Sequence, residues 1–190
     1  MRITFSGGKM DPFEILTKYY YPDSKTYSYL TTHSRMVARK ALQAAERVGH
    51  LNPDTRFIEE AALLHDIGIF KVSAIEIGCI GPMDYVAHGY LGREILEAEG
   101  YPRHALVCER HVGAGITAKE VEKYRLPLPA RDMLPVSVEE EIICWADKFF
   151  TKFPTKLTSE KPVEKVRETV ARYGEGQLAR FDRWQEMFGG

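Results

Sequence analysis

Helix-start signals recur along this chain and constrain its fold more than any other feature of the sequence. Four segments carry such a signal: Asp11-Pro12, Asp54, and the capping-box patterns Thr117 with Glu120 and Ser137 with Glu140. Between these signals, apolar residues recur at steps of three, four or seven, and no segment alternates convincingly at period two. The chain is therefore predicted to be all-α, a single bundle of about eight helices.

The same signals give approximate boundaries. Residues 1–10 are expected to form a loose arm, residues 69–82 an irregular loop, and residues 11–190 one domain. Gly68 is expected to end the helix that Asp54 begins, and Pro82 to begin a helix that reaches Gly100. Further helices are expected after Pro102, Thr117 and Ser137, and over residues 162–188.

Composition limits the classes of function. The formal net charge is −1, so no overall field attracts nucleic acid or an anionic membrane. The three cysteines are odd in number and far apart, which favours a reducing compartment over a disulfide framework. No stretch approaches the 18 apolar residues of a membrane span, and residues 1–10 lack the apolar core of a signal peptide. The expectation is a soluble, cytoplasmic protein.

Metal-capable side chains interrupt the apolar faces of the predicted helices. His33, His65, His88, His111 and Asp147 each share a helix face with apolar residues, and Asp66 follows His65 directly. A single inward histidine is usually an ordinary core residue, but an unpaired buried carboxylate is costly. Imidazoles and carboxylates gathered in a helical core suit Mn, Fe, Co, Ni or Zn, and such an ion would also stabilise the fold.

These residues resemble a known signature. His33, then Leu64-His65-Asp66-Ile67-Gly68, then Asp147 match the H…HD…D pattern of the HD superfamily of metal-dependent phosphohydrolases, and the second segment looks like its HDIG subgroup. Residues 109–117 resemble a poorly characterised HDIG group of archaea and bacteria. The resemblance covers residues 31–150 and leaves the C-terminal helices at 162–188 outside it.

The resemblance implies one or two divalent ions per chain, from among Mn, Fe, Ni, Co, Mg and Zn. It implies a first ion on His33, His65, Asp66 and Asp147, and a second on His88 and His111, with Asp66 bridging the two. Such ions lower the pKa of bound water toward neutrality and offset charge on a phosphoryl oxygen. The expected activity is hydrolysis of a phosphomonoester or phosphodiester, with nucleotides the first substrates to consider.

Basic residues near the motifs are candidates for phosphate binding. Lys148 follows Asp147 directly and is the strongest of them, while Lys71 and Arg110 flank other motif segments. The alternative is that each is an exposed charge or an ordinary ion-pair member. Asp66 and Lys148 are the predicted catalytic residues, and the predicted partner is a small phosphorylated substrate.

Two other functions remain open on the sequence. The same ligands resemble those of the mixed-valent di-iron oxygenases that share the HD fold, and a metal-stabilised regulatory or binding module would also need them. Ile69 stands where cyclic-dinucleotide phosphodiesterases of the superfamily carry lysine, which disfavours that activity. The aromatic face of the last helix, around Phe181, is expected to pack in the core, with a homo-oligomer surface or a pocket lid as the alternatives.

Overall fold

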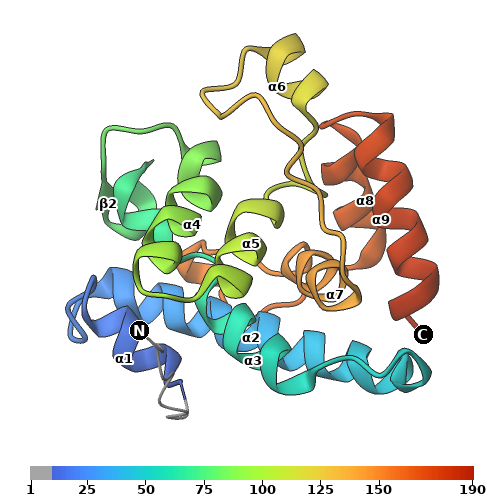
Figure 1. Cartoon of the computed structure of the whole chain (residues 1–190), viewed down its shortest axis with the longest axis horizontal. Helices are drawn as coiled ribbons and strands as arrows, with labels where there is room; N and C mark the ends of the chain where they lie inside the picture. The colour runs from blue at the N-terminus through green and yellow to red at the C-terminus, as the bar shows by residue number, and fades with distance from the viewer. Residues whose placement is uncertain (1–9) are drawn as a thin grey trace, which may run out of the picture.

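Nine α-helices, five short 3-10 turns and one short hairpin make up the regular structure of residues 10–190, which are the residues that the computed structural model describes (Figure 1). The helices are α1 (Pro12–Thr17), α2 (Lys25–Arg47), α3 (Thr55–Leu64), α4 (His88–Ala98), α5 (Pro102–Arg110), α6 (Ala118–Tyr124), α7 (Val138–Asp147), α8 (Val163–Ala171) and α9 (Glu175–Phe188). Strands β1 (Ser73–Ala74) and β2 (Cys79–Ile80) pair antiparallel, with Ser73 opposite Ile80. The all-α prediction is confirmed. The predicted arm lies, except for its last residue, outside the described part of the chain.

The predicted caps begin the helices for which they were expected. Asp11 accepts a hydrogen bond from the Phe13 amide (2.8 Å), and Asp54 accepts one from the Phe57 amide (3.0 Å). Thr117 and Glu120 form a complete capping box. At α7 only half of the box forms: Ser137 accepts from the Glu140 amide, but the Glu140 carboxylate accepts from Arg110 instead.

Two predicted boundaries are wrong. α3 ends at Leu64, and the chain continues from Ile67 to Lys71 as a 3-10 turn, so Gly68 does not end the helix. The helix expected from Pro82 begins at His88 instead, because Met83 is tied to the hairpin and its carbonyl accepts from the Ser73 amide (2.8 Å). The hairpin itself lies in a segment predicted to be irregular.

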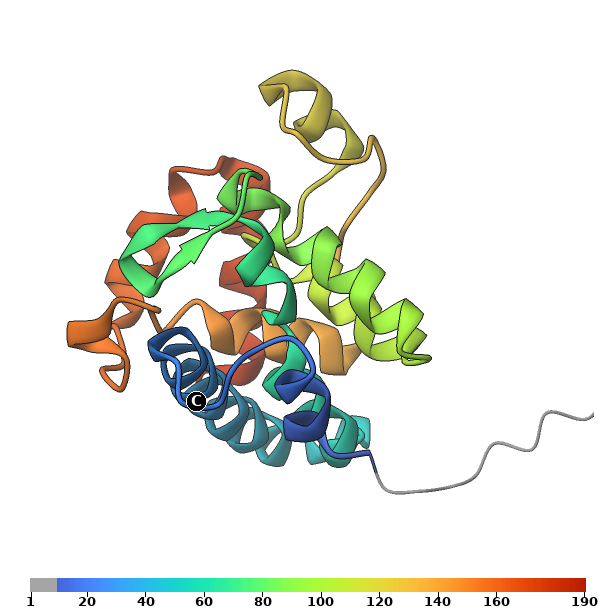
Figure 2. The same ribbon diagram turned by 90° about the vertical axis from the view of Figure 1, so that its left-hand side faces the viewer.

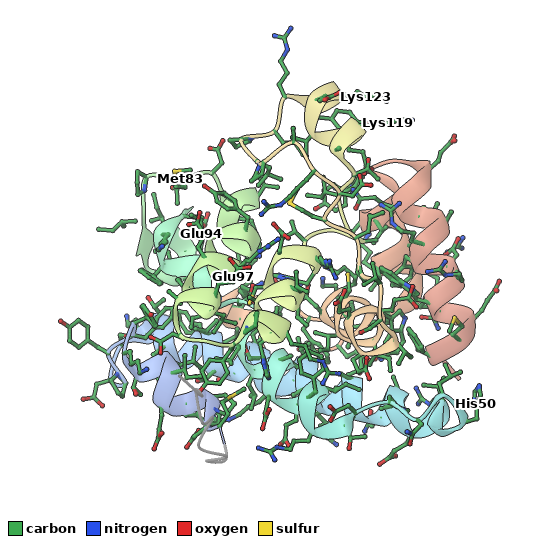
Figure 3. The ribbon with its side chains drawn as sticks, in the orientation of Figure 1. His50, Met83, Glu94, Glu97, Lys119 and Lys123 are labelled. Atoms are coloured by element: carbon green, nitrogen blue, oxygen red, sulfur yellow. The ribbon has the colours of Figure 1, made fainter. Side chains whose placement is uncertain are left out.

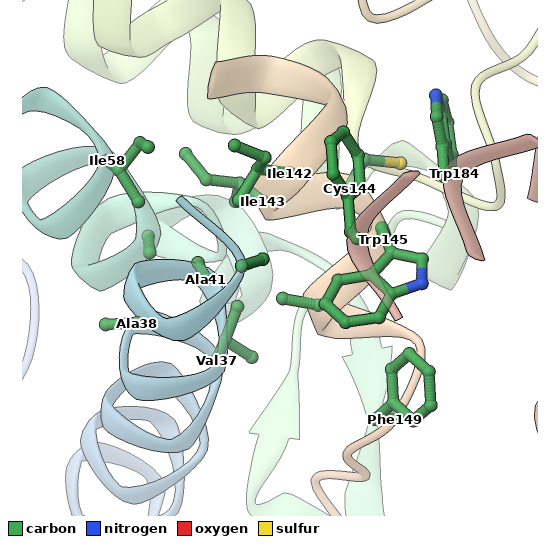
Figure 4. Close-up of a cluster of buried hydrophobic side chains, with 14 of the residues drawn as sticks. Val37, Ala38, Ala41, Ile58, Ile142, Ile143, Cys144, Trp145, Phe149 and Trp184 are labelled. Atoms are coloured by element: carbon green, nitrogen blue, oxygen red, sulfur yellow. The ribbon is translucent and has the colours of Figure 1, made fainter. Parts of the chain in front are cut away.

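The core consists of two large groups of buried apolar side chains. The first joins α2, α3, α7, α8 and α9 and includes Val37, Ile58, Trp145 and Trp184 (Figure 4). The second joins α1, the 3-10 turn at Ile67–Lys71, the hairpin, α4 and α5. Phe181, Trp184 and Phe188 of α9 are fully buried, so their aromatic face packs in the core.

The helices meet around the middle of the molecule, whereas α6 and its two connecting segments extend away from the rest (Figures 1 and 2). Lys119 and Lys123 project from α6 at this far end (Figure 3). Among the helices of residues 10–190, none is long and apolar enough to cross a membrane.

Candidate metal centre

Six buried residues from five helical segments converge at the centre of the fold. They are His33 in α2, His65 and Asp66 just after α3, His88 at the start of α4, His111 just after α5, and Asp147 at the end of α7. None is more than 8% exposed. Five of the six stand at or beside a helix end, where the backbone turns and consecutive side chains need not follow one helical face. The structure brings together all six residues that were predicted to bind metal.

Asp66 lies between two pairs of histidines. Its Oδ2 is 3.1 Å from His65 Nε2 and 3.4 Å from His33 Nε2. Its Oδ1 is 3.2 Å from His88 Nε2 and 3.4 Å from His111 Nε2. One carboxylate therefore faces two separate sets of imidazole nitrogens, as a bridging ligand would.

Asp147 closes the first of these sets. Its Oδ1 is 3.0 Å from His33 Nε2 and 3.5 Å from His65 Nε2. Ligand atoms of His33, His65 and Asp66, and likewise those of Asp66, His88 and His111, lie within 4.8 Å of one another. Each of these triads can hold a metal ion.

Backbone carbonyls orient three of the four rings. The Nδ1 atoms of His65, His88 and His111 lie 2.6–2.7 Å from the carbonyl oxygens of Ala62, Tyr85 and Cys108. A carbonyl oxygen only accepts, so each Nδ1 carries its proton, and in the neutral ring Nε2 presents its lone pair to the cluster. This outer hydrogen bond is the usual support of a metal-binding histidine.

The donor set fits a cation. His88 Nε2 and His111 Nε2 are 3.1 Å apart, and two neutral rings with protonated Nδ1 atoms would place two lone pairs against each other. Asp66 Oδ1 and His65 Nε2 are buried without any hydrogen-bond partner. Orphaned buried acceptors of this kind are costly unless a cation meets them.

The pKa values in the cluster also favour cation binding. Burial acts to raise the pKa of Asp66, but neighbouring His65 and Lys152 hold it well below its usual range. Burial lowers the pKa of His111 to about 3, which keeps that ring neutral. Burial opposes a charge on His65 as well, but Asp66 and Asp147 raise its pKa to about 9. A metal at His65 Nε2 would take the place of that proton.

Two lysines accompany the carboxylates. The Lys148 ammonium donates to Asp147 Oδ2 (2.8 Å) and to the His111 carbonyl (2.9 Å). The Lys152 ammonium lies 2.7 Å from Asp66 Oδ2. Both side chains are close to nine-tenths buried. Each carboxylate of the centre thus has its own lysine.

The centre opens into a cavity of about 1020 Å³. His88, His111 and Asp147 line its floor together with Lys148, Lys152 and Lys161. The cavity is also lined by Tyr124 of α6, Val166 of α8 and Tyr173 just after α8, and the two tyrosines are half-exposed. The volume is ample for a small organic phosphate.

The structure does not bring all the predicted phosphate-binding residues to this cavity. Lys148 lines it, whereas Lys71 and Arg110 do not. Arg110 donates to both carboxylate oxygens of Glu140 at 2.9 Å, which occupies it in an ordinary ion pair. Sequence reasoning missed Lys152 and Lys161, because the segment after α7 is irregular and its spacing places neither side chain.

Comparison with known proteins matches residues 30–151 to the family described as HD domain. An uncharacterized protein of Methanocaldococcus jannaschii is 39% identical over 104 residues, covering 54% of this chain and 53% of that protein. A protein named tRNA (cytidine(56)-2'-O)-methyltransferase from Thermoplasma volcanium is 34% identical over 123 residues, covering 64% of this chain and 32% of its own length. A protein of the same name from Picrophilus torridus is 39% identical over 95 residues, covering 50% of this chain and 24% of its own length.

The chain therefore spans about half of the first relative and a third or less of the other two. No solved structure matches the chain.

Proposed function

The chain belongs to the HD domain family, and from this premise we propose that it is a metal-dependent phosphohydrolase acting on a small phosphate ester. One observation carries the proposal. Four imidazoles and two carboxylates converge on a buried centre that opens, beside three lysines, into a cavity large enough for an organic phosphate. The methyltransferase activity that names two relatives is not proposed, because the match covers a third or less of those proteins.

His33, His65, Asp66 and Asp147 would hold one ion, and Asp66 with His88 and His111 a second. When bound, the metal would lower the pKa of a coordinated water and polarise a phosphoryl oxygen. The Ala62, Tyr85 and Cys108 carbonyls keep three Nε2 lone pairs aimed inward without rearrangement.

The lysines supply charge where a phosphate would lie. The Lys148 ammonium donates two of its N–H groups, to Asp147 and to the His111 carbonyl, and its third N–H group is left for a phosphoryl oxygen. It also fixes Asp147 Oδ2 and so leaves Oδ1 facing His33 and His65. Lys148 thus positions a metal ligand and offers positive charge to the substrate.

No cysteine competes as a nucleophile. Cys79, Cys108 and Cys144 are all buried and free. Burial raises the pKa of Cys79 to about 11 and that of Cys144 to about 12, and it raises the pKa of Cys108 strongly. A thiolate is the reactive form, so these thiols are inert at neutral pH.

A broad phosphoester screen with several divalent metals, run with and without oxygen, tests the proposal. We expect metal-dependent hydrolysis that does not need oxygen, and its loss in His65→Ala and Asp147→Ala with unchanged helical circular dichroism. His104→Ala is the matched control, because His104 pairs with Glu60 and lies outside the cavity lining. Turnover that requires iron and oxygen, with no phosphoester hydrolysed, would establish the oxygenase alternative instead.

A further inference from the structure

Lys161 differs from the other two lysines at the cavity floor. Lys148 and Lys152 are each paired with a carboxylate of the metal centre, whereas no ion pair among residues 10–190 includes Lys161. Its ammonium donates to the Lys148 carbonyl (2.9 Å), and the side chain is partly buried in the cavity wall. Two of its three N–H groups are left for another acceptor.

A half-buried ammonium without a carboxylate is unfavourable unless an anion joins it. Burial lowers the pKa of Lys161, and of the neighbouring charges Asp147 opposes this effect while Lys148 and Lys152 add to it. The floor holds three lysines against two carboxylates, and each divalent ion would add to that excess of positive charge. This balance favours a doubly charged anion over a singly charged one.

The outer part of the cavity has a different character. Its most exposed aromatic lining residues are Tyr124, Phe153 and Tyr173. Two other aromatic lining residues lie deeper, since Tyr85 packs against the His88 ring and Phe150 is buried in the core. The ionisable residues of this outer part are Glu76, Glu120, Arg172 and the tyrosines. Two carboxylates against one guanidinium do not favour a second or third phosphate group. Rings and apolar side chains instead suit a planar or apolar organic group.

We propose that the cavity binds phosphomonoesters of a planar or apolar organic group, with Lys161 beside Lys148 holding the dianionic phosphate. Lys161 is then a specificity-determining residue for monoesters over diesters. The claim that such a phosphomonoester is also a substrate rests on the proposed function. Binding of the anion, by contrast, can be measured without turnover.

Calorimetric titration of the Mn²⁺-loaded protein at pH 8 provides the test, with three phosphonates as probes. Phenylphosphonate carries the dianion and the ring, methylphosphonate lacks the ring, and the monomethyl ester of phenylphosphonate lacks one charge. We expect phenylphosphonate to bind about tenfold more tightly than either of the others. Tyr124→Ala should reduce the difference in affinity between phenylphosphonate and methylphosphonate. Tyr124 is suited to this test because it lines the cavity and is half-exposed, so its loss should not disturb the buried core.

Lys161→Gln should weaken phenylphosphonate binding about tenfold and remove the preference for the dianion, since a charged hydrogen bond is lost. Lys161→Arg should restore that preference. Lys156→Gln is the matched control, because Lys156 is exposed on the same segment and does not line the cavity.

Equal phenylphosphonate affinity in Lys161→Gln and Lys156→Gln, or no phosphonate binding at all, would overturn the inference even if phosphoesters were hydrolysed. Conversely, the expected binding pattern without hydrolysis of any ester would support the anion site and refute the hydrolase proposal.

Discussion

Replacing Gly68 with alanine tests whether close backbone packing sets the spacing of the metal centre. A Cβ at Gly68 would lie 2.5 Å from the Gly92 nitrogen and closer still to the His88 carbonyl oxygen. That is about 1 Å inside the optimum for non-bonded atoms. Both obstacles belong to the backbone of α4, so the helix itself must move.

The cost follows from this rigidity. Overpacking a core costs about 1–3 kcal/mol, and a clash with backbone belongs at the upper end, about 3 kcal/mol. For a chain of this size the expected fall in melting temperature is about 6–12 °C. Because α4 begins at His88, whose Nε2 is 3.2 Å from Asp66 Oδ1, a shift of this helix should also weaken the second metal-binding triad.

Thermal unfolding followed by circular dichroism, together with elemental analysis of the purified protein, measures both effects. Gly49→Ala is the control, since no atom lies within 4 Å of a Cβ there. That substitution should be neutral or stabilising by up to about 1 kcal/mol. A Gly68→Ala protein that melts like the wild type would refute the packing argument. One that melts lower but keeps its full metal content would refute the link to the second triad.

Three further predictions concern the metal and the surrounding ion pairs. Removing metal with a chelator should lower the melting temperature, and adding Mn²⁺ should restore it, because a cation would meet Asp66 Oδ1 and His65 Nε2, which have no hydrogen-bond partner. A melting temperature that does not depend on metal in calorimetric scans would count against the centre. His88→Ala and His111→Ala should each lose about one metal per chain by elemental analysis, while His104→Ala should lose none. An unchanged metal content in both His88→Ala and His111→Ala would indicate a site for a single ion. Glu109→Gln should destabilise the fold by about 1–3 kcal/mol in urea unfolding, since Glu109 is buried between Arg93 and Arg131. Exposed Glu97→Gln should change stability by no more than about 0.5 kcal/mol, and an equal effect of the two would contradict this account.

Local signals explain why so much of the fold could be predicted. Asp11, Asp54, Thr117 and Ser137 all cap helices as expected, because a capping hydrogen bond forms between residues two or three positions apart. The metal-capable residues could be found for a related reason. His33, His88 and Asp147 lie within helices and share faces with core residues, so their burial follows from that periodicity. His65 and His111 lie one residue beyond α3 and α5, so periodicity predicts their direction only approximately.

Contacts between distant segments explain what could not be predicted. Pro82 is a good first residue of a helix, but the hydrogen bond from Ser73 to Met83 holds that segment against the hairpin. Gly68 looks like a helix terminator, yet its role is to let α4 approach. Lys152 and Lys161 reach the cavity from irregular chain, where no period relates sequence spacing to direction.

The position of the centre between the two apolar clusters links metal binding to the fold as a whole. Leu63 packs in the first cluster and Leu64 in the second, and His65 and Asp66 follow them directly. Asp147 and His33 come from helices of the first cluster, whereas His88 comes from a helix of the second. A cation on Asp66 would therefore join side chains anchored in both clusters. Without it, Asp66 Oδ1 and the Nε2 atom of His65 stay buried between the clusters with no hydrogen-bond partner, and apolar packing on either side cannot stabilise them.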